Sequence, residues 1–252
     1  MRIKQLNKLI SVIFLTSSLG TFLVNDAQAS QRNGQGKYQT SRGGAGTYQR
    51  HVQTQPGQSN ARTTWQNQRG EGKSETKRTW NREQGTAHTE RNVTSADSKS
   101  ASFSKDAKRN EDGSVSVKGN GTDFQGRANT LDRQIKRNED GSANVTTART
   151  RDDGKSLTTE QTITRTENGL SQKGTYKTGD GKSGTFEGTA TKTDKGLATQ
   201  QTFTNQDGKT VKREVGIERT DTGVTRTVTI TGPDGKTYTH SGSVTPDAIS
   251  PR

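Results

Sequence analysis

Residues 224–237 read VTRTVTITGPDGKT, and this stretch decides the fold. In its first part, apolar side chains at positions 224, 228 and 230 alternate with polar ones, which is the period of a β-strand with one apolar face. In its second part, Pro233 presets φ and Gly235 accepts the left-handed geometry that follows an Asp in a tight turn. The stretch therefore predicts a strand and the turn of a β-hairpin.

Glycines show that this unit repeats every 27 or 28 residues. One register runs through Gly85, Gly113, Gly141, Gly169, Gly196 and Gly223, and a second runs through Gly126, Gly154, Gly181, Gly208 and Gly235. A period of this length is typical of repeat architectures. Each unit holds two turns, and the turn positions from Gly70 to Gly235 predict up to about fourteen short strands.

The predicted fold class is therefore all-β. We expect a repetitive antiparallel meander of short hairpin strands, because Asp-Gly turns are typical of hairpins. A β-solenoid with one 27-residue coil per rung is the alternative. An open meander leaves two unpaired edges, and such edges favour self-association.

Composition argues against an ordinary globular core. Leu, Ile, Val and Phe make up about 10% of the residues after Ala29, which is the range of disordered chains. A catalytic pocket needs walls of packed apolar side chains, and few are present here. Composition therefore predicts either a disordered polymer or a thin repetitive sheet.

Five segments follow from these patterns. Residues 1–29 have the cationic start, apolar run and Ala27-Gln28-Ala29 site of a cleavable signal peptide, with cleavage predicted after Ala29. Residues 30–60 are predicted to be a disordered, basic arm rich in Gly, Gln and Arg. Residues 61–110 look like degenerate β repeats, 111–245 are regular hairpin repeats, and 246–252 form a tail.

The signal peptide predicts a protein that is secreted, periplasmic or displayed at the cell surface. After residue 30, no segment is apolar enough to re-enter a membrane. The chain has no cysteine, so a disulfide framework is excluded.

No catalytic, cofactor-binding or metal-ligating residues are predicted. His51, His88 and His240 lie in separate segments without ligand spacing. The acidic turns have too few oxygen ligands for a calcium loop, and Lys and Glu interrupt the threonine ranks that an ice-binding face would need. We therefore expect a protein that is not an enzyme and has no cofactor.

Basic residues are concentrated in the first half of the chain. Residues 30–110 carry a net charge of +9, whereas residues 111–252 carry +2. Cations bind polyanions by releasing counterions, and aromatic rings stack on bases or sugars. The candidate polyanion-binding residues are Lys37, Tyr38, Arg42, Tyr48, Arg50, Arg62, Trp65, Arg69, Lys77, Arg78, Trp80 and Arg82.

The repeats, of which Gly232-Pro233-Asp234-Gly235-Lys236-Thr237 is the best specimen, resemble those of uncharacterised secreted repeat proteins of proteobacteria. The resemblance covers residues 111–245 and implies no activity. We expect a structural or binding role at the cell surface or in an extracellular, biofilm-type matrix, with extracellular DNA, acidic polysaccharide or lipopolysaccharide as polyanion partners. The alternative is a self-assembling fibre or amyloid-like matrix subunit.

Overall fold

The computed structural model describes residues 29–41 and 44–246, so nearly all of the predicted signal peptide lies outside the described residues. This part of the chain is a succession of β-strands. They are β1 (Ser30–Thr40), β2 (Ala45–Gln55), β3 (Gln58–Asn67), β4 (Gly70–Asn81), β5 (Thr86–Thr94), β6 (Ser100–Arg109), β7 (Val115–Thr122), β8 (Ala128–Arg137), β9 (Ala143–Arg151), β10 (Ser156–Thr166), β11 (Gly169–Thr178), β12 (Ser183–Thr193), β13 (Gly196–Asn205), β14 (Thr210–Thr220), β15 (Gly223–Thr231) and β16 (Thr237–Pro246).

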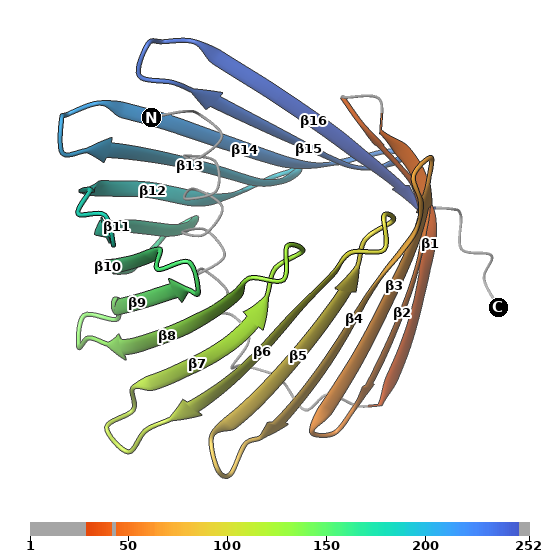
Figure 1. Ribbon diagram of the computed structural model, residues 1–252, viewed down its shortest axis with the longest axis horizontal. Helices are drawn as coiled ribbons and strands as arrows, with labels where there is room; N and C mark the ends of the chain where they lie inside the picture. Colours follow the sequence, from red (N-terminus) through yellow and green to blue (C-terminus); the bar gives the residue numbers. More distant parts are fainter. Residues whose placement is uncertain (1–28, 42–43, 247–252) are drawn as a thin grey trace.

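Each strand pairs antiparallel with the next, and β1 pairs with β16, so the sheet closes into a barrel (Figure 1). The predicted antiparallel meander is confirmed. The solenoid alternative is wrong, because every ladder joins strands side by side in one closed sheet. The two edges that we expected to stay open pair with each other, through five residue pairs.

The segment 30–60 differs from the expected disordered arm, because it forms β1, β2 and the start of β3. Its composition is poor in aliphatic residues, and this is why sequence alone favoured disorder. Closure of the barrel gives β1 a neighbour on both sides, β16 and β2, so its backbone groups are hydrogen-bonded without a large apolar core.

The predicted turn chemistry is confirmed in the hairpin between β8 and β9. The Gly141 amide donates to the Asn138 carbonyl at 3.1 Å, and Gly141 has a φ of 80°. The Asp140 carboxylate accepts a hydrogen bond from the Ser142 amide at 2.9 Å. This side chain thus replaces a backbone partner in the turn, as Asp and Asn commonly do.

The barrel is a single layer around a wide lumen. Strands contact only their neighbours in the ladder order. With strands about 4.8 Å apart and tilted by about 40°, sixteen of them enclose a cylinder roughly 30 Å across between opposite backbones. A barrel of this size is not filled by its own side chains.

Aromatic rings inside the barrel lie over glycines of the next strand. Gly72 is opposite Trp65, and a Cβ added at Gly72 would lie 2.4 Å from the indole ring. Gly184 is placed in the same way against Tyr176, and Gly174 against Phe186; in each case an added Cβ would lie 2.8 Å from the ring. These glycines are therefore required by packing, since a side chain would displace the ring.

We expect Gly72→Ala to lower the free energy of unfolding by about 1–3 kcal/mol, the usual cost of overpacking. Gly34→Ala in β1 is the matched control, because no atom lies within 4 Å of its added Cβ. Alanine there should be neutral, or stabilising by up to about 1 kcal/mol. Urea unfolding followed by tryptophan fluorescence measures both; equal stabilities would contradict the packing of Trp65 on Gly72.

Candidate ligand-binding lumen

The two faces of the closed sheet differ in exposure, and this identifies the inner face. Every buried strand residue lies on one face, as in β10, where Leu157, Thr159, Gln161 and Ile163 are buried and the residues between them are exposed. Among the residues that the structure describes, no second layer covers the sheet, so the sheltered face is the concave one. We therefore assign this face to the lumen.

All of the large apolar side chains in the strands face the lumen. Direct cross-strand pairs share a face, and the ladders link Tyr48 to Trp65, Phe186 to Phe203, and Phe203 to Val211. Leu157, Tyr176, Phe186, Phe203 and Val211 form one buried cluster on this wall, and Ile230 packs against it. The outer face carries threonine, serine, amides and charged side chains, with alanine as its largest apolar residue.

The charges are segregated in the same way. Following the ladders around the barrel places thirteen arginines and two lysines on the lumen face. They are Arg32, Arg50, Arg78, Arg91, Arg109, Arg133, Arg137, Arg149, Arg151, Arg165, Arg213, Arg219 and Arg226, with Lys105 and Lys192.

No strand residue on the lumen face is acidic within the described part of the chain. The nine strand acids are all on the outer face, namely Glu71, Glu75, Glu90, Asp106, Asp132, Glu160, Glu187, Glu214 and Glu218. There they alternate with lysines and with Arg62, and some form ion pairs, such as Arg62 with Glu75 at 3.8 Å. The outer face is thus nearly balanced in charge, whereas the lumen wall is cationic.

Burial and mutual repulsion lower the pKa values of two lumen cations, Arg133 and Lys105. Arg133 is 8% exposed, and burial, followed by the nearby charge of Arg149, lowers its pKa to about 10. Burial likewise lowers the pKa of Lys105, with Arg78 and Arg133 adding repulsion. A shift in this direction means that the protonated form is disfavoured in the folded protein, as expected for cations without counter-charges.

Five of these cations form a rank along one mouth of the barrel. Arg109, Arg137, Arg165, Lys192 and Arg219 are the last lumen-facing residues of β6, β8, β10, β12 and β14. Successive members are two strands apart, or about 10 Å. All five are exposed, and no ion pair joins any of them to an acid among the residues that the structure describes. Acids do lie in the adjoining turns, for example Glu111 and Glu139.

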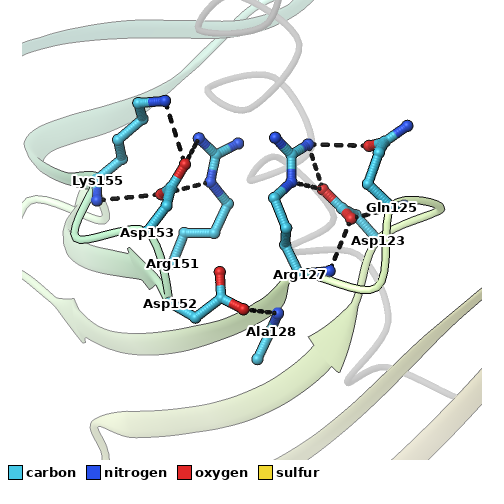
Figure 2. A network of polar contacts seen from close by, with 8 residues as sticks. All are labelled: Asp123, Gln125, Arg127, Ala128, Arg151, Asp152, Asp153 and Lys155. Atoms are coloured by element: carbon cyan, nitrogen blue, oxygen red, sulfur yellow. Dashed lines mark hydrogen bonds and ion pairs between the residues drawn. The ribbon is translucent and has the colours of Figure 1, made fainter.

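At the opposite mouth, basic side chains in and beside the turns form ion pairs with acids of the same turns (Figure 2). Asp123 accepts hydrogen bonds from the guanidinium of Arg127, at 2.8 Å for Nε and 2.5 Å for Nη2. Arg151, although on the lumen face, pairs with Asp153 of the following turn at 2.6 Å, and Lys155 binds the same carboxylate at 3.1 Å. The pKa of Asp153 is held far below its usual range, chiefly by its hydrogen bonds with Arg151.

The predicted polyanion-binding residues do not form one site. Tyr38, Tyr48, Arg50, Trp65, Arg78 and Trp80 face the lumen, whereas Lys37, Arg62 and Lys77 face outward. Arg69 and Arg82 lie in turns at opposite mouths, and Arg42 lies outside the described residues.

Sequence reasoning missed the rank and the buried cations of the second half of the chain. The signal was present, because the rank repeats at the 28- and 27-residue spacing of the glycines. It was overlooked because the net charge of this half is close to zero.

No protein-family model, curated protein or solved structure matches this chain. The described residues contain no helix long and apolar enough to cross a membrane.

We expect Arg133→Leu to raise the free energy of unfolding in low salt by about 1–3 kcal/mol. The substitution removes a buried charge that has no acidic partner on its face of the sheet, and apolar replacements of buried ions are often stabilising. The Arg133 Nε also donates a hydrogen bond to Thr147 at 3.2 Å, and its loss reduces the gain.

Arg62→Leu on the outer face is the control, and it should be neutral or mildly destabilising. Chemical denaturation at low and high ionic strength measures both variants. A large loss of stability in Arg133→Leu at every salt concentration would contradict the view that the charge is unfavourable there.

Proposed function

We propose that this protein is an exported, non-enzymatic binding protein whose lumen takes up an anionic ligand. The observation that carries the proposal is the charge of the lumen wall, whose strands, in the described ranges 29–41 and 44–246, present fifteen cations and no acid. The cleavable signal peptide predicted from residues 1–29 supports a place of action outside the cytoplasm, at the cell surface or in the extracellular matrix.

Electrostatics explains why an anion is the expected ligand. A concave wall of one charge sign concentrates its field and attracts counter-ions. Arg133 and Lys105 are already desolvated by burial in the folded protein. A carboxylate, sulfate or phosphate that binds them therefore gains charge-assisted hydrogen bonds without further desolvation of these two side chains.

Aromatic residues add a second type of contact. Tyr48 and Trp65 are directly opposite one another, and Arg50 is two residues further along β2 on the same face. Rings and a guanidinium so placed can stack on bases or sugars as well as bind their charges. DNA, acidic polysaccharide and lipopolysaccharide therefore remain the proposed classes of partner, with the lumen in place of a disordered arm as the binding surface.

No comparable structural observation supports the alternative function, that of a self-assembling fibre subunit. It relied on open sheet edges as templates for association. In the barrel, β1 and β16 use these edges on each other.

The proposal predicts that labelled dextran sulfate binds to the protein and uncharged dextran does not. Fluorescence anisotropy should show an affinity that falls steeply with added salt. The triple variant Arg109→Gln/Arg137→Gln/Arg165→Gln should weaken binding at least tenfold, because it removes three members of the rank.

The matched control is Lys108→Gln/Lys136→Gln/Lys173→Gln, which changes the net charge equally but on the outer face. It should bind within about threefold of the unmodified protein, an allowance for the smaller long-range field. Equal losses in the two triples would show that dextran sulfate responds only to net charge, and would overturn the proposal.

A further inference from the structure

Near the seam of the barrel, large apolar side chains on the lumen wall are exposed. Leu197 is 39% exposed, and Val224 and Val244 are each 38% exposed. Val224 and Val244 are a direct cross-strand pair, and Leu197 is opposite the half-buried Ile217. We call Leu197, Ile217, Val224 and Val244 the seam patch.

The seam patch extends from Val244, on the closing strand β16, back to Leu197 on β13. Its neighbour across the seam is Tyr38, which is opposite Val244. The ladder between β1 and β16 pairs five residues, fewer than the eight or more of every other ladder. The four side chains of the patch are exposed or half-buried, whereas those of the cluster around Phe186 are buried.

Each apolar residue of β13–β15 in the patch has a cation directly across the ladder. Lys192 is opposite Leu197, and Arg219 is opposite Val224. Arg226 is opposite Ile217. Direct cross-strand partners have their Cβ atoms about 5 Å apart, so cationic groups lie next to exposed aliphatic surface. Lys192 and Arg219 are also the last two members of the rank.

This arrangement suits a ligand that is both apolar and anionic. A hydrophilic polyanion would satisfy the cations but leave the valines and Leu197 against water or against its own polar groups. An uncharged lipid would cover the apolar side chains but leave three cations without counter-charge. A ligand with an acyl chain and an acidic head group satisfies both, since apolar contact and charge neutralisation then occur together.

We infer that the seam patch and its cations bind an acidic amphiphile, a molecule with an acyl chain and a carboxylate, phosphate or sulfate head group. The chain lies on Leu197, Ile217, Val224 and Val244, and the head group contacts Arg219, Lys192 and Arg226. This inference rests on the proposed function and specifies its ligand: both require an anion in the lumen, but only the inference requires the apolar patch.

The direct probe is laurate, titrated calorimetrically below its micelle concentration. Laurate should bind, whereas dodecylammonium, which has a chain of the same length and the opposite charge, should not. Butyrate, which keeps the carboxylate but lacks a long chain, should bind at least tenfold more weakly than laurate. Binding of dodecylammonium as tight as that of laurate would overturn the inference.

The patch is tested with isosteric substitutions. Val224→Thr/Val244→Thr should weaken laurate binding at least tenfold and leave dextran sulfate binding unchanged. The control Val93→Thr/Val115→Thr makes the same chemical change on the lumen wall of β5 and β7, away from the patch, and should leave both ligands unaffected. Thermal melts of each variant confirm that the barrel is folded.

The cations are tested separately. Arg219→Gln should weaken laurate binding at least tenfold, whereas Lys212→Gln, which removes one positive charge from the outer face of the same strand, should not. If laurate fails to bind while dextran sulfate binding persists, the amphiphile inference fails and the anion-binding function stands. If neither ligand binds, both fail.

A vesicle co-sedimentation experiment distinguishes binding of a single amphiphile in the lumen from binding of the protein to a membrane surface. Because the patch faces the lumen, we expect the protein to remain in the supernatant with vesicles of phosphatidylglycerol and to carry extracted lipid with it. Sedimentation with the vesicles that is unaffected by Val224→Thr/Val244→Thr would overturn the assignment of the site to the lumen.

Discussion

The strict alternation of residues along sixteen strands is the constraint on which the rest of the structure depends. Each ladder pairs residues of the same face, so a side chain's parity in the sequence decides whether it points into the lumen or out to solvent. A slip of one residue along β10 would turn Leu157 and Ile163 out to solvent and Glu160 into the lumen. The one-sided apolar surface therefore also specifies the register.

This alternation lets a chain with few apolar residues fold. Aliphatic and aromatic side chains are too sparse for a two-layer core, but all of those in strands lie on one concave wall, where clusters such as Phe186, Phe203 and Tyr176 are sheltered by neighbouring strands. Backbone hydrogen bonds in a closed sheet leave no unpaired edge. Because the sheet is a single layer with these side chains on its inner wall, the lumen is open, cationic and partly apolar. These are the properties from which we propose its function.

The hairpin fold was largely predictable from sequence, whereas the barrel was not. The turn sequence that ends in Gly141 predicts a hairpin turn, and the alternation around Val228 predicts a strand. Closure depends on β1 and β16 finding each other across the length of the chain, and Gly36 and Tyr38 give no local sign of it. The lumen cations recur with a 27- or 28-residue period, but net charge averages them with nearby acids on the outer face, such as Asp132 beside Arg133, and in turns, such as Glu139 after Arg137. The aromatic candidates Tyr48 and Trp65 were recognised, although their place opposite one another follows only from the ladder.

The most direct test of this account is a comparison of two adjacent threonines of β10. Thr158 is exposed on the outer face and Thr159 is 5% exposed on the lumen wall. The chain has no cysteine, so Thr158→Cys and Thr159→Cys each give a single thiol. We predict that a maleimide joined by a short linker to serum albumin, which is too large for the lumen, labels the thiol at 158 rapidly and the thiol at 159 only after unfolding. Equal labelling of the two folded variants would contradict a closed barrel with its cationic face inside.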